Sequence, residues 1–176
     1  MLPENRAGAV ELARALLGLG HRRFAVLSGP PELTTVADRL GGFRDELAAA
    51  GVALDPGAVA EAAFTRDGGY RAMTELLDRG LDATCVFACT DVMAVGAYAA
   101  LRDRGLSVPG DVSVAGFDDI PVVRDLTPPL TTVALPLHRL GEEAMKLALT
   151  ENTGRRRRIV RLPGEVVLRA STAPVA

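Results

Sequence analysis

The sequence predicts an α/β fold in which a parallel sheet is flanked by helices. Three observations support this class. Short apolar runs that end in turn residues alternate with longer segments whose apolar residues recur at helical spacing. The connections between these segments are short, as in successive β-α units of a parallel sheet. Hydrophobic residues make up 48% of the 176 positions, which suffices for one sizeable core.

The first part of the chain supplies these units in order. FAVLSGPP, which begins at Phe24, is a continuous apolar run that is typical of a strand buried on both faces. Gly18 and Gly20 end the helix before it, and Gly51 follows the helix after it. The predicted strands are residues 24–31, 58–62, 84–90 and 112–117, and the predicted helices are residues 6–18, 34–50, 69–80 and 91–105.

The pattern changes after Thr127. Residues 128–135 are predicted to form an extended crossing segment, and residues 136–152 a helix with proline in its first turn. The four arginines at 155–158 are predicted to be a solvated loop, and two strand-like pieces, RRIVRLP and EVVLRAS, close the chain. The apolar stripe of the predicted helix consists of Leu137, Leu140, Ala144, Leu147 and Ala148.

Composition excludes several classes of partner. The formal net charge of −2 gives no sign of nucleic-acid or membrane binding, and no apolar run is long enough to cross a bilayer. The start is unlike a secretory signal, because Glu4 and Glu11 interrupt it. Cys85 and Cys89 lie too far apart on one predicted strand for a disulfide, and both histidines are distant in sequence. We therefore expect buried, reduced thiols in a cytoplasmic protein, with no metal and no cofactor.

The predicted helix at 91–105 carries more apolar surface than one sheet contact needs. In VMAVGAYAAL, residues 92–101, every position is apolar or small, whereas a surface helix needs only one apolar stripe. The surplus face could meet another element of the same chain, but a dimer interface is the preferred interpretation. The predicted interface residues are Val92, Met93, Val95 and Tyr98.

Polar residues gather where the predicted strands end. Ligands of parallel α/β sheets bind beyond the carboxyl ends of the strands, in loops that lead into helices. A carboxylate accepts hydroxyl groups, a guanidinium donates in a fork, and a flat ring packs on sugar C–H faces, so the set suits a polyhydroxylated ligand. The set comprises Ser28, Arg39, Arg66, Thr90, Asp91, Asp118 and Asp119, together with Phe64 and Phe117.

Several of these residues also have a structural or a catalytic alternative, and Phe117 could be an ordinary core residue. Asp91 and Asp119 could cap the helices that follow them, and Arg39 could form a surface ion pair. Asp118 and Asp119 could act as an acid–base pair or as Mg²⁺ ligands. The only lysine in the chain, Lys146, lies outside these loops, and the sequence contains no phosphate-binding glycine motif. The sequence therefore favours a binding protein over an enzyme.

The run from CVFACTDVMAVGAYAAL to VAGFDDIPVVRDLTPPLTTVALPLHRLGEEA strongly resembles the LacI/GalR family of bacterial transcriptional regulators. GHRRFAVLSGP and ADRLGGFRDEL are similar to the strand and helix that precede it in that family, and LPGEVVLRAST to its closing segment. The resemblance covers about residues 5–172. It implies a periplasmic-binding-protein-like fold of type I, whose two lobes close around a small ligand, usually a sugar or a nucleoside.

The resemblance also implies roles for individual residues. Arg39 matches the arginine that clamps the effector, Asp118 the aspartate that takes ligand hydroxyls, and Phe64 an aromatic that packs on the ligand. Thr90 stands where the family often has asparagine, which keeps a hydroxyl but loses the amide. Leu135 and Leu137 occupy crossing-segment positions that often reach the effector, and Ser28 completes the predicted ligand-binding set.

The two aspartates in VAGFDDI are predicted to have different roles. Asp118 is expected to face Arg39, whereas Asp119 is expected to hold the turn before Pro121. Two adjacent carboxylates are tolerable if they point in different directions.

By resemblance, residues 1–134 form mostly the C-terminal lobe, residues 135–154 a crossing segment and a helix that belong to the N-terminal lobe, and residues 155–176 return strands and a tail. The family's helix-turn-helix does not occur in this sequence, so DNA would be contacted only through a domain outside it. The expected protein is a cytoplasmic, non-enzymatic homodimer that binds a sugar-like effector. The alternatives are a sugar-binding protein of a transport system, a Mg²⁺-dependent enzyme using Asp118 and Asp119, and a fragment that binds nothing.

Overall fold

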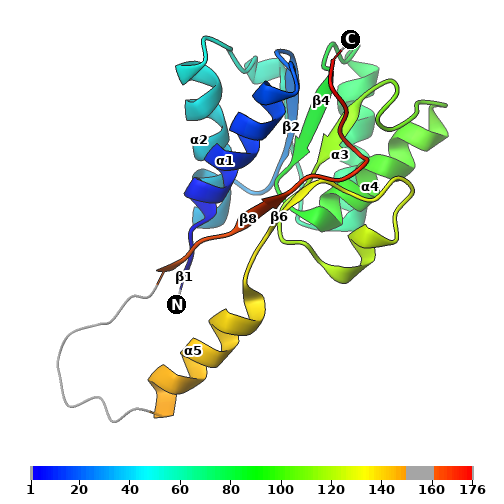
Figure 1. Cartoon of the computed structure of the whole chain (residues 1–176). Coiled ribbons are helices and arrows are strands. Elements are labelled where there is room, and N and C mark those ends of the chain that lie inside the picture. Colours follow the sequence, from blue (N-terminus) through cyan, green and yellow to red (C-terminus); the bar gives the residue numbers. More distant parts are fainter. Residues whose placement is uncertain (1, 150–160, 176) are drawn as a thin grey trace.

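The computed structural model describes residues 2–149 and 161–175 (Figure 1). Helices and strands alternate in the predicted order as far as residue 115. The elements are β1 (Leu2–Pro3), α1 (Asn5–Gly18), β2 (Phe24–Ser28), α2 (Thr34–Ala49), the 3₁₀ helix η1 (Pro56–Ala58), β3 (Val59–Glu61), α3 (Arg66–Asp78), β4 (Cys85–Ala88), α4 (Asp91–Asp103), β5 (Ser113–Ala115), the 3₁₀ helix η2 (Pro121–Arg124), β6 (Thr132–Ala134), α5 (Leu137–Leu149), β7 (Arg161–Leu162) and β8 (Glu165–Val167).

A four-stranded parallel sheet of order β3-β2-β4-β5 forms the centre of the molecule, which confirms the predicted fold class. Alternate residues of each strand point to opposite faces. Val26 and Phe87 join the core beneath α1 and α2, whereas Leu27 and Val86 join the core beneath α3 and α4. Each face of the sheet is therefore covered by two helices, as Figure 1 shows. Cys85 is buried and free, as predicted, and so is Cys89.

Helices α3 and α4 pack with their backbones almost in contact. A Cβ atom on Gly96 would lie 2.0 Å from the carbonyl oxygen of Arg66, and one on Gly69 would lie 2.1 Å from that of Met93. Only glycine permits so close an approach. Much of the surplus apolar face of α4 is consequently buried against α3 within the same chain.

This packing corrects one residue of the predicted dimer interface. Met93 is completely buried in the core, so its side chain cannot reach a second subunit. Val92, Val95 and Tyr98 remain partly exposed, and the Tyr98 hydroxyl donates a hydrogen bond to the carbonyl of Pro128, 3.0 Å away. The rotation of α4 about its axis is set by its glycine contact with α3, which an all-round apolar sequence does not reveal.

Two crossing segments run beside the sheet, at the end of β5. The backbone of Thr131 bridges that of Ala115, and Ala134 bridges Asp118, so β6 lies parallel to the chain at and beyond β5. Strand β8 pairs antiparallel with β6, and the short β1 pairs with β7. The predicted extended segment at 128–135 is therefore confirmed over β6.

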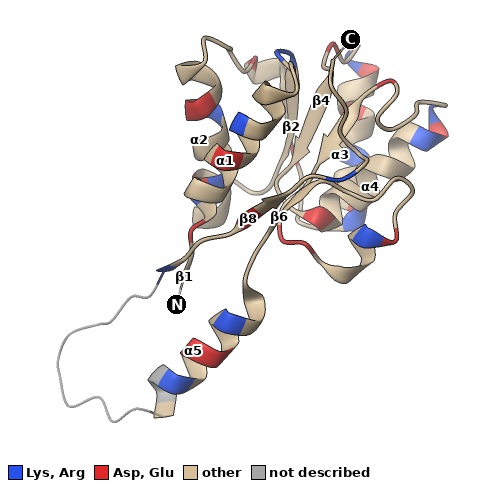
Figure 2. Cartoon of the chain, viewed as in Figure 1, with Lys and Arg blue, Asp and Glu red and all other residues tan. Residues whose placement is uncertain are grey.

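Helix α5 projects away from this lobe (Figure 1). It begins at Leu137 and ends at Leu149, within the predicted range of 136–152. Two of the predicted stripe residues, Leu147 and Ala148, lie outside the side chains that the structure describes, as does the arginine run at 155–158. Figure 2 shows that charged residues occupy mainly the helices and loops. In the described ranges, no helix has the length and apolar content needed to cross a membrane.

Candidate functional site

Arg39 forms the centre of a polar site at the carboxyl edge of the sheet. Its guanidinium donates hydrogen bonds to Asn5 Oδ1 at 3.0 Å, to the carbonyl of Cys89 at 2.7 Å and to Asp118 Oδ1 at 2.8 Å. It also lies over the ring of Phe117, 4.0 Å from the centroid. Only 4% of the residue is exposed, so the surface ion pair considered above is wrong. These three protein acceptors fix the orientation of the fork.

Asp118 faces Arg39, as predicted, and it does so in an unusual backbone conformation. Its φ angle is 120°, which L residues rarely adopt. Both backbone polar groups of Asp118 are bonded to the crossing segment, because its amide donates to the carbonyl of Val133 at 2.9 Å and its carbonyl accepts from the amide of Leu135 at 3.5 Å. Burial raises the pKa of Asp118, and the Arg39 guanidinium partly offsets that rise.

The Asp118 carboxylate keeps spare hydrogen-bonding capacity. Arg39 engages one oxygen, Oδ1, and among the described residues no donor reaches Oδ2. The side chain is 22% exposed, so that oxygen can meet a ligand. A carboxylate oxygen next to a fixed guanidinium can accept a hydroxyl hydrogen while the cation screens its charge.

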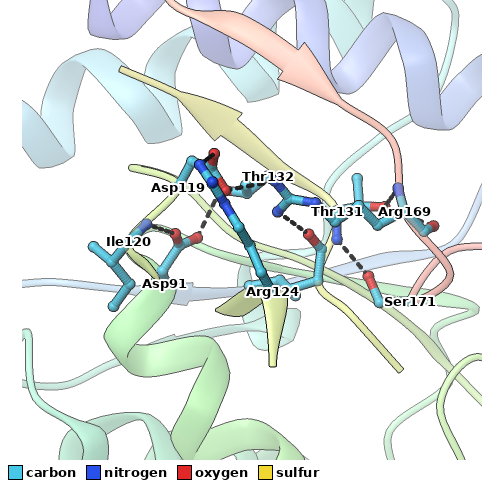
Figure 3. Close-up of polar contacts among 9 residues, drawn as sticks. Asp91, Asp119, Ile120, Arg124, Thr131, Thr132, Arg169 and Ser171 are labelled. Atoms are coloured by element: carbon cyan, nitrogen blue, oxygen red, sulfur yellow. Dashed lines mark hydrogen bonds and ion pairs between the residues drawn. The ribbon is translucent and has the colours of Figure 1, made fainter. Parts of the chain in front are cut away.

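Asp119 points the other way and performs a structural task, as predicted. Its two oxygens accept hydrogen bonds from Arg124 Nη2 and from Arg169 Nη2, both at 2.7 Å (Figure 3). Although burial opposes it, the two guanidinium groups hold the pKa of Asp119 below its usual range. Asp119 does not cap the following η2, which has no side-chain cap. Since both carboxylates face arginines, this pair is poorly arranged to hold Mg²⁺.

Thr90, and not Asp91, caps α4. Thr90 has extended dihedrals, and its hydroxyl accepts from the amide of Met93 at 3.4 Å. Asp91 already belongs to the helix and is fully buried, where it accepts from Ile120 N at 2.9 Å and from the Thr132 hydroxyl at 2.6 Å. Burial raises the pKa of Asp91 to about 6. The cap predicted at Asp91 is therefore wrong, and this carboxylate instead joins the loop after β5 to β6 (Figure 3).

The Phe64 ring lies over the carboxyl end of β2. A Cβ atom on Gly29 would lie 2.1 Å from the Phe64 ring, so glycine is needed for the ring to lie there. Phe64 contacts the core clusters of both sheet faces and remains half-buried. Ser28, by contrast, is 1% exposed and donates to the carbonyl of Gly29 at 3.3 Å. The structure thus leaves the aromatic ring partly accessible and encloses the serine.

The two predicted crossing-segment leucines differ in their surroundings. Leu135 is partly buried against the core beneath α1 and α2, and its amide donates to the carbonyl of Asp118 at 3.5 Å. Leu137 is 54% exposed at the start of α5. The structure brings the first leucine to the Asp118 loop.

Sequence reasoning missed two partners of this region. Asn5 accepts from Arg39, and Arg169 pairs with Asp119. The arginine that directly follows the apolar VVL of EVVLRAS was the one available signal for Arg169. Nothing in the sequence around Asn5 separates it from an ordinary first residue of a helix. Among the residues with described positions, no group of three or more His, Cys, Asp and Glu could hold a metal ion.

Comparisons with known proteins agree with the fold of the chain. Residues 13–172 match the model of the periplasmic binding protein-like domain. The HTH-type transcriptional regulator CelR of Thermobifida fusca is 40% identical over 159 residues, which cover 90% of this chain and 47% of that protein. Two solved structures superpose closely. A CelR–cellobiose complex has a TM-score of 0.88 at 38% identity, covering 96% of this chain and 52% of that one. A LacI family regulator from Enterococcus faecium with bound ribose has a TM-score of 0.89 at 32% identity, covering 99% and 65%.

The chain spans about half the length of the curated relatives that it matches, since the shares of CelR and of a ribose operon repressor are 47% and 52%.

Proposed function

We propose that the chain binds a small sugar-like effector for a LacI/GalR-type regulator. The chain belongs to the periplasmic binding protein-like domain family. Its relatives include LacI-family transcriptional regulators, which supports the proposal. In this proposal the chain is the effector-binding and dimerisation part of a cytoplasmic, non-enzymatic protein. DNA would be contacted by a helix-turn-helix domain outside these 176 residues. Ligand occupancy would shift the population of conformations that bind DNA.

One observation carries the proposal, namely the preorganised donor–acceptor pair of Arg39 and Asp118. Arg39 is nearly buried and has three fixed acceptors. Asp118 is held at a φ of 120°, and no donor among the described residues reaches its second oxygen. Backbone strain of this kind persists only where surrounding contacts enforce it, and it gathers at ligand-binding sites. A fixed fork beside a free carboxylate oxygen matches the vicinal hydroxyls of a sugar or a ribonucleoside.

Other residues have subordinate roles in the proposal. Phe64 supplies an apolar face for ligand C–H groups, and Leu135 borders the site beside Asp118. Leu137 would contact a ligand only at the edge, given its exposure of 54%. Thr90 and Ser28 would act mainly through the backbone, because the Thr90 hydroxyl caps α4 and Ser28 is enclosed.

A thermal-shift screen separates this function from its rivals. The probes are cellobiose, ribose, a ribonucleoside and MgCl₂, added separately to the 176-residue chain. We expect stabilisation by one of the hydroxylated compounds and none by MgCl₂, since a ligand that binds only the native state raises its melting temperature. Stabilisation by MgCl₂ alone would favour the metal-dependent enzyme. A transport protein of the same fold would respond to sugars as the regulator does. A gel-shift assay with DNA, using the longest natural protein that includes these residues, separates the two, because only a regulator should bind DNA.

A further inference from the structure

A second ionic cluster lies directly beside the candidate site. Asp119 is only 9% exposed, and its arginine partners differ sharply, because Arg124 is 62% exposed and Arg169 only 16%. The second terminal nitrogen of Arg169 donates to the carbonyl of Leu130 at 2.8 Å. The pair of Asp119 and Arg169 is therefore an interior contact between the loop after β5 and the segment after β8.

The same segment fastens the two crossing strands to each other. The hydroxyl of Thr131 accepts from the backbone amide of Arg169 at 2.8 Å, and Ser171 Oγ accepts from the amide of Thr131 at 2.7 Å. Ser171 Oγ in turn donates to the carbonyl of Val114 at 2.6 Å. The chain just before β6 and the chain just after β8 are thus tied to the sheet and to one another at a single place.

The two aspartates share one strained stretch of backbone. Asp118 has a φ of 120° and Asp119 a φ of 55°, and both lie in the left-handed region. Asp118 is anchored to Arg39, and Asp119 to Arg169. An uncompensated change of ψ at Asp118 or of φ at Asp119 reorients one carboxylate relative to the other, because a single rigid peptide joins the two residues. A single peptide unit therefore separates the residue that pairs with Arg39 from the residue that pairs with Arg169.

We propose that Asp119 and Arg169 are positioning residues for the effector site: they hold Asp118 toward Arg39, and they transmit what happens at Asp118 to the crossing strands β6 and β8. The inference rests on the proposed function for its biological meaning, but the mechanical coupling is a property of the chain alone. Strand β6 leads within three residues into α5. The coupling therefore directs a signal from the site toward the part of the molecule that projects from the lobe.

Hydrogen–deuterium exchange of the unliganded chain tests the coupling without any ligand. D118N removes the charge that faces Arg39, and its effect is measured on peptides that cover residues 165–171. We expect D118N to speed exchange there by about threefold, and by the same factor in an R124M background. In an R169M background we expect D118N to add nothing. R124M is the matched control, because it also removes one arginine from Asp119 but leaves the tie to the segment after β8.

Equal effects of D118N in the R169M and R124M backgrounds would overturn the proposal. R169K guards against a trivial loss of folding in R169M, because it keeps the charge and the aliphatic stem but cannot bridge both Asp119 and the Leu130 carbonyl. If Arg169 had only a structural role, D118N should still speed exchange by about threefold in an R169K background. Under the proposal, this effect of D118N should be lost in R169K as it is in R169M. Full coupling in R169K would therefore contradict the assignment.

Calorimetric titration with cellobiose and with ribose gives a second readout. For the sugar that binds, R169M should raise Kd by about tenfold and R124M by less than about twofold. An unchanged Kd in R169M would overturn the inference and leave the proposed function standing. If neither these sugars nor the ribonucleoside binds the parent chain, the proposed effector class fails, and the exchange experiment still decides the coupling.

Discussion

The sheet lobe and helix α5 place their apolar residues in opposite environments. In the lobe, large side chains such as Phe87 and Leu101 are completely buried, and both faces of the sheet are covered. In α5, Met145 is 60% exposed and Leu149 is 78% exposed. The lobe therefore buries its own large apolar side chains, whereas the described part of the chain does not cover Met145 and Leu149. A helix with such a face gains its stability from a surface that packs against it.

The contrast extends to the ion pairs. Arg39 is buried with three fixed partners, whereas Arg6 pairs with Asp45 on the surface, with both side chains more than half exposed. Interior ion pairs are costly to break, and exposed ones contribute little. The site is thus part of the lobe's stable framework rather than an addition to its surface.

The largest effect is expected for R39M. The substitution leaves the Asp118 carboxylate and the Cys89 carbonyl without their donor in a buried place, which should lower the free energy of unfolding by about 3–5 kcal/mol. R6M, the exposed counterpart, should cost less than about 1 kcal/mol. Urea unfolding followed by circular dichroism checks both, and similar losses in the two variants would contradict the contrast.

Two glycine-to-alanine changes compare a packed helix with an unpacked one. In G96A the new methyl group would lie 2.0 Å from the Arg66 carbonyl oxygen, so α3 and α4 must separate. We expect a loss of about 1–3 kcal/mol, the usual cost of overpacking. At Gly141 in α5 a Cβ atom meets nothing within 4 Å, and G141A should stabilise the helix by up to about 1 kcal/mol. Effects of the same sign and size would show that α5 is packed like α4.

A smaller effect is expected in the pH dependence of stability. Burial raises the pKa of Asp91 to about 6 from an ordinary value of 3.8. Between these values the folded state binds more protons than the unfolded state, so this group's contribution is present at low pH and is lost as the pH rises toward 6. D91N should remove this group's contribution to the fall in the free energy of unfolding as the pH rises. Chemical unfolding between pH 4 and pH 7 measures it, and an identical slope in D91N would contradict the assignment.

The smallest effect on stability is expected for the double variant M145K/L149K. Both side chains are largely exposed, so the free energy of unfolding should change by less than about 0.5 kcal/mol. We propose that the chain associates through the exposed apolar residues of α5 as well as through α4, so this variant should nevertheless lower the mass measured by light scattering. The pair L140K/L147K, on the predicted apolar stripe, should act in the same direction. An unchanged mass in both double variants would exclude α5 from the association.

The sequence predicted most of the lobe and the central pair of the site. The alternation of apolar runs and helical periods placed every strand of the sheet, because that pattern is set locally by burial on two faces. The position of Asp118 and Asp119 at the end of a strand, with the LacI/GalR resemblance, predicted that one would face Arg39 and the other would hold the turn. Both orientations are confirmed, and so is the resemblance.

The wrong or missing predictions concern residues whose roles are set by tertiary contacts and not by the local sequence. Thr90 and Asp91 are both good capping residues, and the backbone at the end of β4 selects Thr90. Met93 was assigned to a dimer interface because the periodicity of α4 cannot fix its rotation. Arg169 was missed because it comes from a segment 50 positions beyond Asp119, which only the folded chain brings back. The ligand contacts of the predicted site residues stay predictions.

Calorimetric titration of D118N against D45N tests the central claim most directly. Each variant removes the charge of an arginine-paired aspartate, one at the site and one on the surface. With the sugar that stabilises the parent chain, binding should persist in D45N at the parent Kd and weaken in D118N by about a hundredfold or more, as expected when a carboxylate that accepts a ligand hydroxyl is lost. Equal binding by D118N and D45N would contradict the assignment of Asp118 and Arg39 as the effector site.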